Sequence, residues 1–164
     1  MADLVPAVVF DINVYVDAIT GPASDWPLLT AVPPRSANAA ADCLSIAFDA
    51  DDFRLFASPH ILVNLTRVLR RADLTEPTTA ETVDAILDLI ELTGGAVIDP
   101  PRAVFDATDY EGNLILDLAV ATQAILVVSG DTDLTSISPW RGCVAILRPR
   151  DFFVARVVAA RRRP

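Results

Sequence analysis

Short apolar runs alternate along the chain with longer segments in which apolar residues recur at helical spacing. A continuous apolar run rich in Val is typical of a strand buried on both faces of a sheet. Apolar residues at i, i+3 and i+4 instead predict an amphipathic helix. The first pattern predicts strands over residues 4–10, 53–57, 96–98, 124–129 and 143–147.

The segments between these strands predict helices. We expect Ser36 to be the N-cap of a helix over residues 36–50, and Ser58 followed by Pro59 to begin a helix that runs to Arg71. Further helices are predicted over 13–20 and 79–92, from about 111 and from 149. Strands that alternate with helices favour a parallel sheet covered on both faces. We therefore expect a three-layer α/β/α fold around a central parallel sheet of about five short strands.

The length of 164 residues fits one domain, and we expect residues 1–164 to form it. Residues 21–35 contain four prolines and predict a long loop, of a length that often serves as a lid or binding segment. Residues 161–164 form an Arg-rich tail. No apolar run approaches the ~18 residues of a membrane span, and no basic region precedes an apolar leader. The sequence therefore favours a cytoplasmic protein without membrane contact.

The charge pattern gives an indication of the binding partner. The net charge of -9 argues against a protein that coats nucleic acid by charge alone, and all 13 basic residues are Arg. Arg67, Arg70 and Arg71 share one helical face at i, i+3 and i+4, which suits contact with phosphates or with a partner's carboxylates. The alternative is a solvated helix end whose cations offset the helix dipole.

Two aspartates follow predicted strands directly. Asp11 comes after the first apolar run, and Asp131 comes after the run that ends in Ser129. Because the carboxyl ends of parallel strands meet at one edge of a sheet, we expect these carboxylates, with Asp133 beside them, to share a cleft. Clustered carboxylates need a cation, and oxygen ligands favour Mg²⁺ or Mn²⁺. Such sites serve phosphoryl transfer, in which a metal activates water.

Three stretches, VVFDINVYVDAI, SPHILVNLTRVLRR and DYEGNLILDLAVATQAILVVSGDTDL, resemble the PIN-domain family, and within it the toxin-type branch of bacterial toxin-antitoxin pairs. The resemblance extends from Val8 to about Phe153. It implies a small Rossmann-like sheet and an acidic site for Mg²⁺- or Mn²⁺-dependent cleavage of RNA. It also implies a homodimer that is silenced by a cognate antitoxin protein.

The resemblance assigns roles to several positions. The family's first acid matches Asp11, and the asparagine two residues later matches Asn13. The fourth acid matches Asp131, with Asp133 beside it, and Thr132 between them is expected to orient one of the two. Asp11 and Asp131 are thus the expected catalytic metal ligands, helped by Asp133.

Two acids of the family pattern are missing. The second acid, a glutamate, should stand where this chain has Asn64, and the third should stand at Gly112, just before Asn113. Asn64 still offers a neutral carbonyl oxygen, and Asn113 is expected to support the site. The candidate stand-ins for the missing acids are Asp109, Glu111 and Asp117. For Asp109 and Glu111, the alternative is an ordinary role at a helix N-terminus.

Two carboxylates alone bind Mg²⁺ weakly, so two functions remain open. The first is a metal-dependent endoribonuclease of the toxin type. The second is a degenerate PIN domain that binds RNA or a protein partner without cleaving. A haloacid dehalogenase-like phosphatase is disfavoured because it needs a second aspartate where this chain has Asn13, and a lysine, which the chain lacks.

Overall fold

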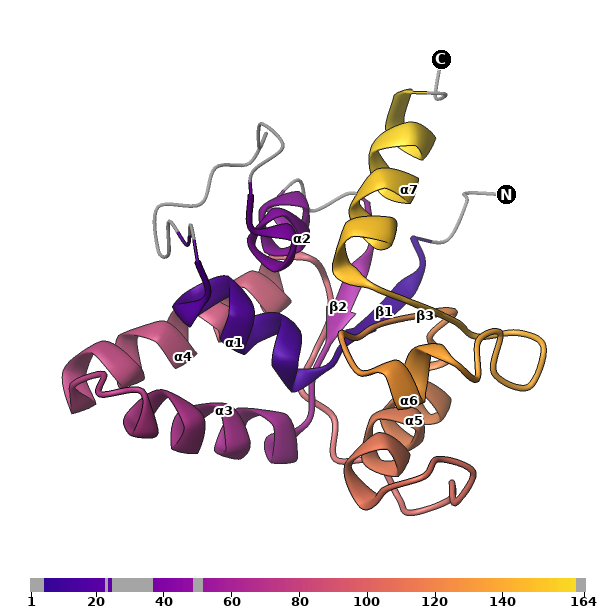
Figure 1. Cartoon of the computed structure of the whole chain (residues 1–164), viewed down its shortest axis with the longest axis horizontal. Helices are drawn as coiled ribbons and strands as arrows, with labels where there is room; N and C mark the ends of the chain where they lie inside the picture. Colours follow the sequence, from indigo (N-terminus) through magenta and orange to yellow (C-terminus); the bar gives the residue numbers. More distant parts are fainter. Residues whose placement is uncertain (1–4, 23, 25–36, 49–51, 162–164) are drawn as a thin grey trace.

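The computed structural model describes residues 5–22, 24, 37–48 and 52–161, and it has a parallel sheet flanked by helices (Figure 1). This confirms the predicted α/β class. Four strands lie in the order β2-β1-β3-β4, and every neighbouring pair is parallel. The elements are β1 (Ala7–Phe10), α1 (Ile12–Thr20), α2 (Ala39–Ala47), β2 (Arg54–Phe56), α3 (Pro59–Arg71), α4 (Glu76–Leu92), α5 (Tyr110–Thr122), β3 (Leu126–Val128), α6 (Thr132–Thr135), β4 (Ala145–Leu147) and α7 (Pro149–Arg161).

The prediction of a strand over residues 96–98 is wrong. This segment makes one isolated parallel bridge, between Ala57 and Val97. Ala57 donates its N–H to the Ala96 carbonyl and accepts from the Ile98 N–H, after which the chain runs into two prolines at residues 100 and 101. Proline has no N–H to donate to a ladder, so the pairing ends after a single bridge.

The central strand β1 positions the site. Val8, Val9 and Phe10 have no exposed surface, as expected for a strand covered on both faces. Phe10 pairs in register with Val128 of β3, while β2 lies on the other side of β1. From β1 the chain adds β2 on one side and later β3 on the other, so the strand order reverses between β1 and β3. The carboxyl ends of these two strands flank the point where such folds place their ligands.

Helix starts differ from the prediction where several capping residues lie close together. α2 begins at Ala39, because the Asn38 side chain caps it by accepting the N–H of Ala41. The predicted cap Ser36, like most of the predicted loop over 21–35, lies outside the described residues. Thr75 caps α4 and starts it before residue 79. Ser58 caps α3 as predicted, with Pro59 in the first turn.

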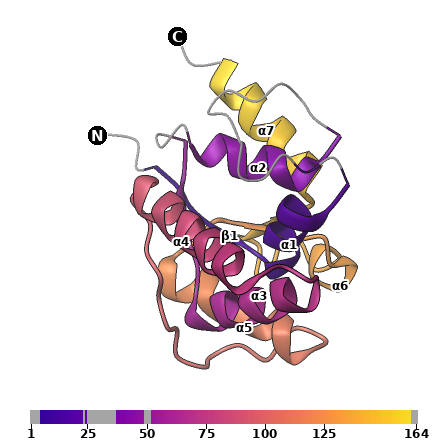
Figure 2. The same cartoon turned by 90° about the vertical axis from the view of Figure 1, so that its left-hand side faces the viewer.

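The helices form two layers around the sheet. α1 packs on α2, and α2 packs on α7, whereas α5 packs against β1 from the opposite side (Figures 1 and 2). The α2/α7 side is filled by an aromatic cluster in which Phe10 contacts the rings of Tyr15, Phe53 and Phe152. No helix in the described part of the chain is both long enough and apolar enough to span a bilayer.

Candidate active site

Asp11 occupies the carboxyl end of β1 and is 7% exposed. Its Oδ1 accepts the N–H of Ile12 at 2.7 Å, which caps α1. Its Oδ2 accepts the Ser129 hydroxyl at 2.7 Å and the Asn13 amide at 3.1 Å. Both oxygens of this carboxylate are thus held in fixed positions by neighbouring donors.

Ser129 links the two strand ends and was not predicted as a site residue. Its hydroxyl donates to Asp11 and accepts the backbone N–H of Asp131 at 3.0 Å. Asn13 completes the link, because its Oδ1 accepts the N–H of Gly130 at 2.9 Å. The position of Ser129, directly after a strand and before Gly130, was the available signal in the sequence.

Asp131 follows β3 and caps the short helix α6. Its Oδ1 accepts the N–H of Asp133 at 2.9 Å. The side chain of Asp133 is itself exposed, and the hydroxyl of Thr132 accepts a hydrogen bond from Arg148 at 3.3 Å. The Thr132 hydroxyl is therefore bound by Arg148, which follows β4, and not by either aspartate.

Asp11 and Asp131 lie close enough to interact electrostatically. Burial raises the pKa of Asp11 above its usual value, and the charge of Asp131 raises this pKa further. The hydrogen bonds from Ser129, Ile12 and Asn13 lower the pKa and oppose both effects. A buried carboxylate whose ionisation is opposed by a second carboxylate nearby is an arrangement that a cation stabilises.

Asn64, where the family resemblance implies the second acid, belongs to a different network. Nε2 of His60 lies 2.7 Å from Oε2 of Glu111 and 2.8 Å from the side-chain amide of Asn64. These contacts join the first turns of α3 and α5. Glu111, one of the candidate stand-ins, is thereby paired with His60, and residue spacing cannot indicate a pair separated by 51 positions.

Gly112, where the family resemblance implies the third acid, is tightly enclosed. A Cβ atom there would lie 2.9 Å from Oδ1 of Asp109, 3.1 Å from Cβ of Ala107 and 3.2 Å from Cδ2 of Leu134. Asp109 is the N-cap of α5 and accepts the N–H of Gly112 at 2.7 Å. Asn113 also has a structural role, since its Oδ1 accepts the N–H of Ala107 at 2.8 Å.

Asp117, the third candidate stand-in, is buried in α5 and engaged by the preceding loop. Its Oδ1 accepts the N–H groups of Ala103 and Val104 at 2.8 and 2.7 Å, and Arg102 pairs with its Oδ2 at 3.1 Å. Among the described residues, no group of three or more His, Cys, Asp or Glu side chains is placed to hold a metal ion. None of Asp109, Glu111 and Asp117 thus joins the Asp11–Asp131 pair in this arrangement.

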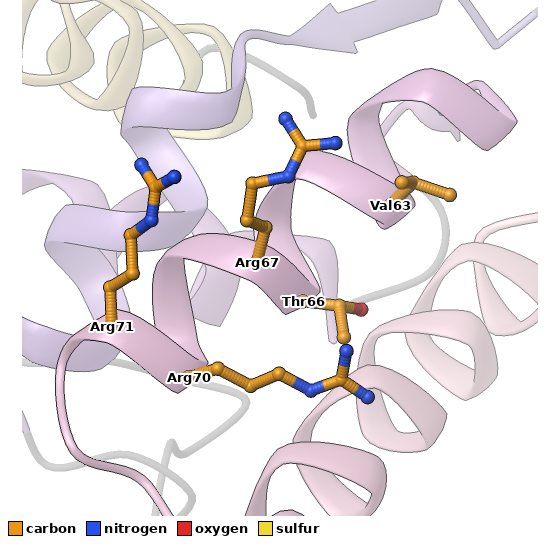
Figure 3. A pocket seen from close by; sticks show the side chains of 5 residues that line it. All are labelled: Val63, Thr66, Arg67, Arg70 and Arg71. Atoms are coloured by element: carbon orange, nitrogen blue, oxygen red, sulfur yellow. The ribbon is translucent and has the colours of Figure 1, made fainter.

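The three arginines of α3 do not behave alike. Arg70 pairs with Glu76 of α4 through Nε at 2.7 Å and through a second nitrogen at 3.1 Å. Arg67 and Arg71 point to another side of the helix (Figure 3). Together with Val63 and Thr66, the three arginines line a shallow hollow of about 530 Å³.

A PIN domain family model matches residues 7–133, which include β1, α3, α5, β3 and both aspartates of the site. The chain belongs to the PIN-domain family. PIN domains are generally nuclease domains that use divalent metals. A search among proteins of curated function finds no match to the chain.

The donors of this PIN domain fit a sparsely liganded Mg²⁺ or Mn²⁺. Mg²⁺ keeps several waters and is held in many phosphoryl-transfer sites by one or two carboxylates together with substrate phosphates. Asp11 and Asp131 supply two such carboxylates, and their mutual repulsion favours a cation between them. The remaining ligands would have to come from water and from a phosphate group.

Replacing Ser129 tests how the PIN domain holds Asp11. In Ser129→Ala, the N–H of Asp131 loses its acceptor and Asp11 loses a hydrogen bond that lowers its pKa. We expect a loss of about 1–2 kcal/mol in the free energy of unfolding at neutral pH. A carboxyl group whose pKa is raised by folding contributes stability below its unfolded pKa, and this contribution is lost as pH rises through its folded pKa. The Ser129 hydroxyl stabilises the ionised form of Asp11, so its removal matters most where Asp11 is ionised. The loss should therefore be larger at neutral pH than near about pH 4.

Urea unfolding at both pH values measures the effect, and Ser136→Ala is the matched control. The Ser136 hydroxyl is exposed and donates only to the carbonyl of Asp133. An equal loss at both pH values in Ser129→Ala would contradict the coupling between this hydroxyl and the ionisation of Asp11.

Proposed function

We propose that this PIN domain is a toxin-type endoribonuclease that uses Mg²⁺ or Mn²⁺ to hydrolyse RNA phosphodiesters. The observation that carries the proposal is the pair of carboxylates at the ends of adjacent parallel strands, where the charge of Asp131 raises the pKa of Asp11. Asp11 and Asp131 would hold the cation. When bound, a divalent cation in such a site supplies an activated water and stabilises the leaving oxygen.

The protein's own contribution is positioning. Ser129 and Asn13 fix the orientation of the Asp11 carboxylate, and the cap of α6 fixes that of Asp131. A ligand pair held in this way loses little side-chain entropy when a cation and a phosphate arrive. Because only two carboxylates are present, binding of the cation should strengthen when RNA supplies phosphate oxygens.

Incubation of the purified protein with single-stranded RNA tests the proposal. We expect cleavage with Mg²⁺ or Mn²⁺ and none in the presence of a chelator. Mn²⁺ titration by calorimetry, with and without a non-cleavable RNA analogue, separates binding of the cation from cleavage. Absence of cleavage under every metal condition would contradict the proposal.

A second function, a degenerate PIN domain that binds RNA or protein without cleaving, is favoured by one observation. Among the described residues, no third carboxylate joins Asp11 and Asp131. This alternative predicts RNA binding that is indifferent to Mg²⁺ and Mn²⁺. Metal-dependent cleavage would exclude it.

Asn64 is the position at which metal affinity should be easiest to raise. Asn64→Glu places a carboxylate where the family resemblance puts the second acid, on a half-buried face of α3. We expect Mn²⁺ to bind on the order of tenfold tighter, because a third negative ligand offsets more of the cation's charge. Asn64→Gln, neutral and of the same length as Glu, is the control. Equal Mn²⁺ affinity in the two variants would show that residue 64 does not reach the cation.

We further propose, on the toxin-type resemblance, that the protein forms a homodimer and binds a cognate antitoxin. A basic side chain of the antitoxin would occupy the cleft between Asp11 and Asp131, where it would relieve the repulsion that the cation otherwise relieves. Such an antitoxin should compete with Mn²⁺ for the protein in calorimetry.

A further inference from the structure

We propose that one face of α3 is a track for the backbone of a single-stranded RNA, leading from the carboxylate cleft to the far end of the helix. The track consists of His60, Asn64, Arg67 and Arg71. The choice of RNA as its occupant rests on the proposed function. The placement of the residues rests on the structure alone.

The four residues are spaced at i, i+4, i+7 and i+11, so they form one stripe along a helix with 3.6 residues per turn. The stripe is distinct from the buried face of α3, which carries Ile61, Leu65 and Leu69. It extends over about 16 Å at ~1.5 Å per residue.

The stripe begins at the acidic site. α3 follows β2, so its first turn lies at the carboxyl edge of the sheet, the edge that carries Asp11 and Asp131. His60 contacts Glu111 at the start of α5, and the adjacent Gly112 faces Leu134 of α6, the helix that Asp131 caps. These contacts place the stripe's first turn beside the cleft.

The far end of the stripe carries guanidinium groups that are available to a ligand. Arg67 and Arg71 are exposed, and neither has a carboxylate partner among residues 5–22, 24, 37–48 and 52–161. Both point to the same side of α3, away from Arg70 (Figure 3). Arg70 is occupied by Glu76 and lies off the stripe. The sequence predicted that Arg67, Arg70 and Arg71 contact phosphates or a partner's carboxylates. We therefore assign this contact to Arg67 and Arg71 alone.

The spacing and charge of these groups suit a nucleic-acid strand. Arg67 and Arg71 are one helical turn apart, about 6 Å along the axis, so both can reach phosphates of one strand. Guanidinium groups bind phosphate oxygens in a bidentate manner. In a chain with a net charge of -9, two exposed guanidinium groups on a stripe that begins beside the cleft favour a polyanion whose scissile phosphate enters that cleft. An acidic protein partner would not need the stripe to run into the acidic site.

The test measures RNA binding without cleavage. Fluorescence anisotropy of a short labelled single-stranded RNA, in a chelator and over a series of salt concentrations, compares the full-length protein with the double variant Arg67→Gln/Arg71→Gln. Each phosphate contact on a single strand contributes about 0.7 to the slope of log affinity against log salt. We expect the slope to fall by about 1.4 and the affinity to fall on the order of tenfold at ~0.1 M salt.

Arg70→Gln is the control, because it removes one positive charge, against two in the double variant, from the same helix at a residue already neutralised by Glu76. It should leave slope and affinity nearly unchanged. Thermal unfolding of all variants verifies that these exposed substitutions leave the fold intact. An equal effect of Arg70→Gln on RNA binding would contradict the proposed track. An unchanged RNA affinity in the double variant would also contradict it, even if that variant lost binding to an acidic protein.

A separate cleavage assay with Mn²⁺ distinguishes failure of the track from failure of the proposed function. A slope change in the double variant without cleavage by the wild-type protein supports the track and contradicts the nuclease. Metal-dependent cleavage by the wild-type protein, with an unchanged slope in the double variant, supports the nuclease and overturns the track.

Discussion

Asp11→Asn is expected to reduce metal-dependent RNA cleavage by at least about 10³-fold, or ~4 kcal/mol of transition-state stabilisation. The change keeps the size of the side chain but removes one of the two carboxylates proposed to hold the cation. Asn is a good helix cap, so the N–H of Ile12 keeps an acceptor. Burial and Asp131 raise the pKa of Asp11, so a neutral side chain offsets part of the stability lost because its amide nitrogen cannot accept the hydrogen bonds from Ser129 and Asn13.

Two measurements together identify Asp11 as a metal ligand. Mn²⁺ should raise the melting temperature of the wild-type protein, because it binds only the folded state, and it should leave that of Asp11→Asn unchanged. Asp17→Asn is the control, since Asp17 is exposed on the same helix. Equal cleavage by wild type and Asp11→Asn would remove the nuclease hypothesis.

Phe152→Ala is expected to lower the free energy of unfolding by about 3–5 kcal/mol. Phe152 in α7 has no exposed surface and stands edge-on to the rings of Phe10 and Phe53, with centroids 5.6 and 5.3 Å away. Truncation leaves a cavity between the last helix and the central strand that a rigid sheet cannot close. Urea unfolding at neutral pH measures the loss.

Val154→Ala is the matched control on the same helix, because Val154 is 44% exposed. It should cost less than ~0.5 kcal/mol. Phe152 lies beyond residue 133, where the family match ends. A loss in Phe152→Ala no greater than that of Val154→Ala would mean that α7 is not part of the cooperative core.

The hydrophobic pattern predicted the alternation of strands and helices because each core strand is a continuous apolar run. It failed at residues 96–98, where an apolar run lacks a ladder partner beyond Ala57. It also placed the start of α2 at Ser36, whereas Asn38 caps this helix and donates its amide to the carbonyl of Asp17. That second contact links α2 to α1, and no local propensity reveals it.

The site was predictable where it depends on strand ends. Asp11 follows β1 directly and Asp131 follows β3 after Ser129 and Gly130, and parallel pairing of β1 with β3 brings the two carboxylates near each other. The role of Ser129 depends on the backbone turning at Gly130 so that one hydroxyl meets both aspartates. The contact of His60 with Glu111 depends on the packing of α3 near α5, which residue spacing does not encode.

The crowding at Gly112 gives the evolution of this site a direction. A change from an acid to Gly at residue 112 removes atoms, whereas the change from Gly112 to an acid meets the cap formed by Asp109 and the side chain of Leu134. A return would require the side chains of Asp109, Ala107 and Leu134 to shift, and the Asp109 cap would shift with them. Position 64 has no such barrier, since Asn64 is half-buried and already carries a side chain of similar shape. Selection for stronger metal binding would therefore act on Asn64 long before it restored an acid at Gly112.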